Sequence, residues 1–141
     1  MIEGIHHLGL SVRDVDVSAA WYVDVLGFRR DGEFESPDGM RRKIFLRHDG
    51  LRARLGLTQH QDSGPDLFDE RRVGLDHLAF AVVHRTDLDA WAVSLAAASV
   101  VHSGILPANS IAGAAVLVLR DPDNIQLELF FDPTDHDQQI G

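Results

Sequence analysis

Three side chains that lie far apart along this sequence have the chemistry of a metal site. His7 and His77 each stand near the start of an alternating, strand-like segment, and Glu128 stands in an apolar segment close to the end of the chain. Two neutral imidazoles and one carboxylate form a facial set of ligands that leaves other coordination positions open. We predict that the three residues bind one divalent metal ion (iron, manganese, zinc, nickel or cobalt), with Glu128 also taking part in catalysis.

Each of these residues also has an ordinary explanation. A single histidine at the start of a strand is usually a surface or core residue, and a single glutamate in a final strand can simply face solvent. The metal site is favoured because histidine recurs at equivalent positions in two similar segments.

Strand parity predicts which residues share a face with the proposed ligands. Alternate residues of a strand point to the same side of its sheet. The neighbours of the two histidines on that side are small: Gly9, Ser11, Ala79 and Ala81. The opposite sides carry large apolar residues: Leu8, Leu10, Leu78, Phe80, Leu127 and Leu129. We therefore expect the ligands to face an open cavity while the opposite faces pack under helices.

An internal repeat organises the chain. IHHLGLSV at residues 5–12 resembles LDHLAFAV at residues 75–82, an offset of 70, and a tryptophan follows each at the same offset. RLGL at 54–57 resembles QLEL at 126–129, an offset of 72. Two copies of one supersecondary unit explain these matches.

Each copy reads as a strand, a helix and further strands, which predicts an α+β fold of two βαβββ units. We place a single domain at 1–133, with unit one at 2–59, a polar linker at 60–74, unit two at 75–133 and a tail at 134–141. The expected strands are 4–12, 42–48 and 52–59 around an Asp49-Gly50 turn, then 75–83, 100–104, 114–120 and 125–131.

The helices are placed by their caps and apolar spacing. The first is expected to begin at Asp16 or Ser18 and to end at Leu26 before Gly27, and the second to begin at Thr86 with Asp89. The residues expected to be buried at helical spacing are Val17, Ala20, Trp21, Val25 and Phe28, and then Leu88, Trp91, Ala92 and Leu95.

Composition excludes several functions. The 141 residues carry a net charge of −9, so a nucleic-acid partner is not expected. The sequence has no cysteine, which excludes thiolate ligands and a cysteine nucleophile. The start lacks the pattern of a signal peptide, and no apolar run approaches the ~20 residues that cross a bilayer. We expect a cytoplasmic protein with no membrane partner.

The motifs IHHLGLSV, WYVDVLGF, GLDHLAFAV and RDPDNIQLELF together resemble the vicinal oxygen chelate superfamily, the glyoxalase, bleomycin resistance protein and dioxygenase proteins. The resemblance runs from Ile2 to Pro133. It implies an open, cup-shaped mixed sheet built from paired βαβββ units, a homodimer, metal ligands at His7, His77 and Glu128, and a small-molecule substrate with vicinal oxygens. It leaves open whether His7 joins the other two ligands within one chain or from a partner chain.

Differences from individual members of this superfamily bear on which reaction the protein catalyses. Glyoxalase I and the related epimerase supply a fourth ligand, Glu or Gln, at the position of Gly56 here. Extradiol dioxygenases resemble this three-ligand set more closely, but they and fosfomycin-modifying enzymes use a tyrosine at the position of Val118. Bleomycin-binding proteins typically lack the metal ligands that are present here.

Further residues are candidates for substrate binding. Arg54 and Thr58 share parity with Gly56, and Arg54 has the guanidinium that orients an anionic substrate. Gln126 and Phe130 share parity with Glu128, and Val118 completes the substrate-binding set. His48 and His60 are weak candidates for an acid–base group, since exposed loop histidines are the commoner case.

The sequence therefore predicts a metal-dependent enzyme, either a glyoxalase-like lyase or isomerase or an extradiol-type dioxygenase. The alternative is a binding protein that sequesters a small molecule such as an antibiotic. A third reading is a fold whose site has degenerated.

Overall fold

The computed structural model describes residues 1–135, and these form two compact units, Met1–Leu67 and a second that begins at Phe68. Each unit contains one helix and one four-stranded mixed sheet. The predicted α+β class with two βαβββ units is therefore confirmed.

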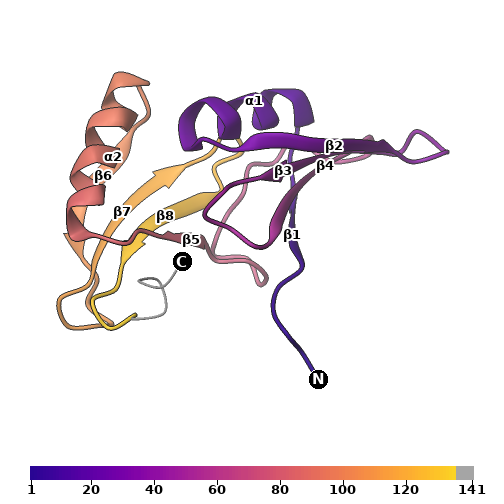
Figure 1. Cartoon of the computed structure of the whole chain (residues 1–141). Helices are drawn as coiled ribbons and strands as arrows, with labels where there is room; N and C mark the ends of the chain where they lie inside the picture. The colour runs from indigo at the N-terminus through magenta and orange to yellow at the C-terminus, as the bar shows by residue number, and fades with distance from the viewer. Residues whose placement is uncertain (136–141) are drawn as a thin grey trace. The chain divides into compact units, whose positions relative to one another are not determined.

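The first unit runs through β1 (His7–Ser11), α1 (Val15–Leu26), β2 (Arg29–Glu35), β3 (Arg41–Arg47) and β4 (Arg54–His60). Its strand order is β1-β4-β3-β2, with β1 parallel to β4 and the other pairs antiparallel. Helix α1 covers one face of this sheet, as Figure 1 shows. No pattern in the sequence had indicated β2.

The second unit repeats this plan with β5 (Leu78–Ala81), α2 (Arg85–Ala97), β6 (His102–Pro107), β7 (Ala115–Arg120) and β8 (Gln126–Phe131). The order is β5-β8-β7-β6, with β5 parallel to β8. The internal repeat read from the sequence is thus a repeat of topology.

One face of each sheet is buried under its helix. Fully buried residues on these faces are Leu46 and Leu57 in the first unit, and Leu117, Leu119 and Leu127 in the second. The intervening residues of β1, β5 and β8 are more exposed, Gly9 and Ala79 among them. The expected alternation of faces is confirmed.

Helix α1 begins earlier than expected. Asp14 is its N-cap, and its carboxylate accepts hydrogen bonds from the backbone amides of Asp16 and Val17 at 3.0 Å. Because that carboxylate already satisfies the first free amides of the helix, the caps expected at Asp16 and Ser18 are wrong. The predicted Gly27 end is confirmed, since its φ is 77°.

The earlier start also changes the buried stripe of α1. The buried residues are Val15, Ser18, Ala19, Tyr22 and Leu26. Val17, expected to be buried, is 54% exposed. Ala20 is exposed and Trp21 and Val25 are half-buried, whereas Phe28 is buried as expected.

Helix α2 also begins before its expected cap. His84 precedes it, and the His84 amide donates to the Asp87 carboxylate at 2.8 Å. The predicted cap by Thr86 and Asp89 is therefore wrong. Leu88 and Leu95 are fully buried as expected, whereas Trp91 is half-buried.

The end of the expected linker belongs to the second unit. The Phe68 amide donates to the Asp123 carbonyl at 2.9 Å, and the Asn124 side chain donates to the Phe68 carbonyl at 3.0 Å. Strand β5 starts only at Leu78, so His77 immediately precedes the strand expected at 75–83. No helix in the described part of the chain is long and apolar enough to cross a membrane.

Candidate metal centre

His77 and Glu128 meet on the open face of the second sheet. The His77 Nε2 atom lies 3.6 Å from Glu128 Oε2, and the two side chains are 40% and 14% exposed. Strand register causes this approach, because Ala79 on β5 pairs with Glu128 on β8 and His77 lies two residues before Ala79. Two of the three predicted ligands are therefore in contact.

A second carboxylate supports His77 from behind. Asp76 Oδ1 lies 2.6 Å from His77 Nδ1. A proton on Nδ1 satisfies this contact, which leaves the lone pair of Nε2 free on the side of Glu128. A carboxylate that orients the far nitrogen is the usual support of a metal-binding histidine.

Gln126 and Arg120 hold Glu128 from its other side. Arg120 donates to Gln126 Oε1 at 3.1 Å, so the amide nitrogen of Gln126 is the atom that faces Glu128 Oε1 at 3.4 Å. This donor occupies one carboxylate oxygen and leaves the other toward His77. The orientation of the Gln126 amide thus follows from Arg120.

Arg120 is itself fixed by the preceding linker. Glu70 accepts from both terminal nitrogens of Arg120, at 2.9 and 2.8 Å. These hydrogen bonds lower the pKa of Glu70 to about 2, and the same contact raises the pKa of Arg120. Both groups therefore stay charged near neutral pH, and a polar chain runs from Glu70 through Arg120 and Gln126 to Glu128.

His7, the third predicted ligand, belongs to the first unit. It is the exposed first residue of β1, in register with Arg54 of β4. The Nδ1 atom of the neighbouring His6 lies 2.9 Å from the Nδ1 atom of His7.

Within residues 1–135, no group of three or more His, Asp or Glu side chains is arranged to hold a metal ion. The second unit thus presents two candidate ligands, His77 and Glu128, and the assignment of His7 as the third stays a prediction.

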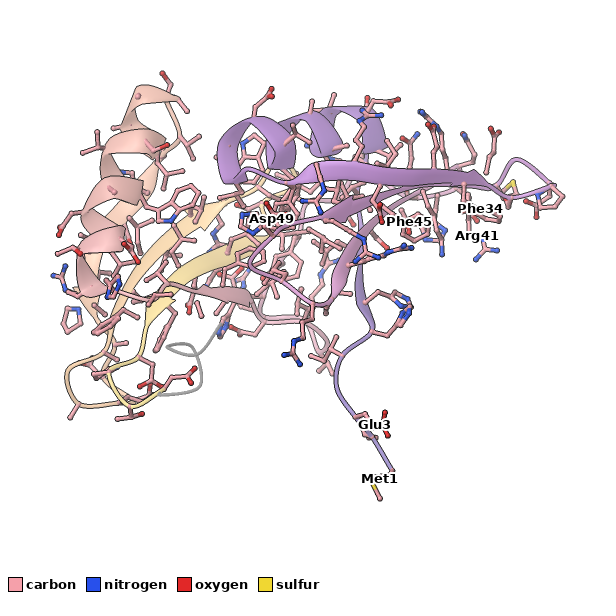
Figure 2. All side chains as sticks on the ribbon, viewed as in Figure 1. Met1, Glu3, Phe34, Arg41, Phe45 and Asp49 are labelled. Carbon is pink, nitrogen blue, oxygen red and sulfur yellow. The ribbon has the colours of Figure 1, made fainter. Side chains whose placement is uncertain are left out.

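The open face of the first sheet carries arginines in place of a ligand pair. Gly56 is in register with Gly9 and Phe45, and its counterpart in the second repeat is Glu128. Arg54 Nε lies 3.1 Å from Asp31 Oδ2, and Arg47 Nε lies 2.7 Å from the same oxygen. Figure 2 labels Phe45 on β3, on the side of the sheet away from α1.

The other predicted substrate-binding residues fall on the open faces. Val118 is in register with Glu128, and Phe130 is in register with Ala81. Thr58 is in register with Ser11 and Lys43 and is half-exposed. Their placement agrees with strand parity, while contact with a substrate stays a prediction.

The loop histidines have structural contacts. His48 Nδ1 accepts from the Gly50 amide at 3.1 Å, and its ring packs against Phe28 with centroids 5.2 Å apart. These contacts shape the connection between β3 and β4. His60 ends β4 and is half-exposed.

Sequence reasoning missed several residues at these faces. Arg120 follows Val118 by two positions, so strand parity alone would have found it. Asp76 is adjacent to His77 in the sequence, and its carboxylate could have been considered as a support for that proposed ligand. Asp31 and Glu70 gave no signal, because β2 was not located and Glu70 lay in the expected linker.

Comparisons with protein families and with solved structures point to the same superfamily. A sequence model of the Glyoxalase/Bleomycin resistance protein/Dioxygenase superfamily matches residues 4–129. A solved glyoxylase/bleomycin resistance protein/dioxygenase domain from Frankia sp. EAN1pec is 32% identical, with 94% of this chain and 99% of that chain covered and a TM-score of 0.83. No curated protein sequence matches the chain.

More distant structures share the fold. A lactoylglutathione lyase from Agrobacterium tumefaciens is 21% identical, with 92% and 94% of the two chains covered and a TM-score of 0.68. The fosfomycin resistance protein FosX from Listeria monocytogenes is 17% identical, with 100% of both chains covered and a TM-score of 0.70. The FosX crystals contained Mn(II) and 1S,2S-dihydroxypropylphosphonic acid.

Proposed function

The chain belongs to the glyoxalase/bleomycin resistance protein/dioxygenase superfamily, and from that membership we propose that it is a divalent-metal-dependent enzyme acting on a small molecule with vicinal oxygens. The observation that carries the proposal is the contact between His77 and Glu128, 3.6 Å apart, with Asp76 behind the histidine. His7 is proposed as the third ligand, from the same chain or from a partner.

The donor set suits such an ion. A neutral imidazole with a free Nε2 and a carboxylate with one free oxygen are ligands for iron, manganese, zinc, nickel or cobalt. A bound ion would supply Lewis acidity to two adjacent substrate oxygens. The manganese in FosX, a protein of the same fold, supports a divalent ion here.

The residues around the ion would have separate roles in metal binding, catalysis and substrate binding. Glu128 would hold the ion and is the proposed catalytic carboxylate, with Gln126 fixing its second oxygen. Val118 and Phe130 form an apolar wall beside it on the same face. Gly56 adds no fourth ligand of the kind that glyoxalase I has, and Val118 offers no phenol of the kind that extradiol dioxygenases use. Each reaction class thus lacks one feature here, so lyase or isomerase chemistry and extradiol-type dioxygenation both stay as proposed reaction classes.

One observation favours a second function, sequestration of a small molecule. Ala79 and Ala81 are exposed on the open face of β5, and small side chains there leave room for a flat ligand beside Phe130. A protein of this kind would bind its ligand tightly without converting it. We also propose that the protein is a cytoplasmic homodimer.

The test is metal analysis of protein purified without chelator. We expect a stoichiometric divalent metal in the wild type, lost in His77→Ala and Glu128→Gln. It should be kept in His84→Ala, which removes another exposed histidine of the same unit. The proposal fails if His77→Ala keeps its metal, or if the wild type neither contains a metal nor takes one up on anaerobic reconstitution.

A ligand screen then separates the two functions. Diols, 2-oxoaldehydes and antibiotics are offered to metal-loaded and metal-free protein. Turnover that requires the metal supports the enzyme, whereas tight binding to metal-free protein without turnover supports sequestration.

A further inference from the structure

Two arginines on the open face of the first sheet share a single carboxylate. Arg47 on β3 and Arg54 on β4 both direct Nε to Oδ2 of Asp31, at 2.7 and 3.1 Å. We propose that this group, the Arg47–Asp31–Arg54 cluster, is an anion subsite that binds a carboxylate or phosphonate on the substrate. The inference rests on the proposed function and names its substrate class.

The geometry leaves the binding ends of both arginines open. Each guanidinium uses its Nε edge on Asp31, and neither donates a terminal NH2 group to any residue in the described part of the chain. Both side chains are 38% exposed. Free terminal nitrogens on a planar fork are the donors that bind carboxylate and phosphonate oxygens in pairs.

The charge on this face is also unbalanced. Lys43 lies on the same side as Phe45 and Arg47, and it has no ion pair among residues 1–135. Asp31 is the carboxylate that both arginines contact, and Lys43 adds a further positive charge to this face. Hydrogen bonding from Arg47 lowers the pKa of Asp31, so it stays ionised and can hold both arginines in position. An excess of positive charge in a chain of net charge −9 points to an anionic ligand.

The cluster adjoins a proposed metal ligand. Arg54 is in register with His7 on the parallel strand β1. Paired strands lie about 4.8 Å apart, so a substrate held beside His7 would bring an anionic group within reach of Arg54. The counterpart of Arg54 in the second repeat is Gln126, a neutral residue already committed to Arg120 and Glu128. The repeat has therefore placed free cationic donors on one sheet and the ligand pair on the other.

Two matched probes isolate the anionic group. Catechol and 3,4-dihydroxybenzoate carry the same adjacent hydroxyls and differ by one carboxylate. Their dissociation constants are measured by calorimetry on metal-loaded wild type, Arg54→Gln and Arg47→Gln, and on Arg52→Gln as a control from the exposed connection before β4. Metal content and thermal unfolding are recorded for every variant.

We expect the wild type and the Arg52→Gln control to bind the carboxylated probe more tightly than catechol by about tenfold or more. Arg54→Gln and Arg47→Gln should lose most of this preference while their affinity for catechol and their metal content stay unchanged. Equal affinities for the two probes in the wild type, or a preference that survives in Arg54→Gln, would overturn the inference and leave the proposed function intact.

A second arm does not depend on the metal. Inorganic phosphate is titrated into metal-free protein and followed by amide chemical shifts. Saturable shifts at β3 and β4 that disappear in Arg54→Gln support the subsite even if the protein proves to hold no metal. Absence of such shifts in folded wild type counts against the subsite, whatever the outcome of the metal analysis.

Discussion

Glu128 is held from two sides by groups that leave one of its oxygens available. Gln126 approaches Oε1 and His77 approaches Oε2, and each partner is in turn fixed by a charged residue, Arg120 or Asp76. At the scale of single residues, the candidate site therefore depends on its supporting contacts as much as on its ligands.

Asp76 gives the first prediction. Its removal in Asp76→Ala frees the His77 ring to rotate and to place its proton on either nitrogen. We expect divalent-metal affinity to fall by ~10–100-fold, measured by competition with a chromophoric chelator. Asp89→Ala removes another exposed carboxylate of the same unit and should leave the affinity unchanged. An unaltered affinity in Asp76→Ala would show that the contact does not support the ligand.

Arg120 gives the second prediction, through its effect on Gln126. In Arg120→Met the Gln126 amide loses the partner that fixes its orientation, so metal affinity should fall. Gln126→Met should cause a similar loss. Because both substitutions break one chain of contacts, the double variant should lose little more than either single variant. Additive losses in these four proteins would contradict a shared path to Glu128.

At the scale of elements, caps decide where the helices begin. Asp14 satisfies two amides of α1, so Asp14→Ala should lower the free energy of unfolding by about 1 kcal/mol. Chemical denaturation measures the change. Asp24→Ala, on the exposed side of the same helix, should have an effect close to zero, and an equal loss in both variants would refute the role of the cap.

The ion pair between Glu70 of the linker and Arg120 of β7 predicts how the stability of the fold depends on pH. Arg120 lowers the pKa of Glu70 from 4.5 to about 2 in the folded protein. A lowered carboxyl pKa stabilises the fold above the unfolded value, and this contribution is lost as the pH falls toward 2. The effect should be small, since the two side chains are about one-third exposed.

Unfolding free energies of wild type and Glu70→Gln, compared from about pH 5 to about pH 3, test this prediction. The wild type should lose more stability over that interval than the variant. Parallel pH profiles would show that the ion pair does not stabilise the folded state.

The sequence specified the elements better than their ends. Alternation of small and large residues predicted both faces of β1, β5 and β8, because burial acts on every second residue of a strand. The predicted start of α1 was wrong because the side chains of Asp14, Asp16 and Ser18 can all cap a helix, and only the folded backbone selects one of them. Arg54 was singled out without its partners, since Asp31 reaches it only through the pairing of β2 with β3.

At the scale of the whole molecule, the three proposed ligands come from both repeats. They could be supplied by one chain or by two chains of a homodimer, so the oligomeric state must be measured. Light scattering should give twice the 15.6 kDa chain mass for the proposed homodimer. If the partner supplies His7, metal affinity should fall as the protein is diluted to monomer. An affinity that does not depend on protein concentration would assign all three ligands to one chain.

The glycine at position 56 has a consequence for how such proteins diverge. A Cβ built there would make ordinary contacts, 3.5 Å from the Leu8 carbonyl and 3.7 Å from the Phe45 ring, so the backbone admits a side chain. A single nucleotide change converts a glycine codon that ends in a purine into a glutamate codon. A descendant of this chain could acquire a carboxylate at this position without rebuilding its sheet.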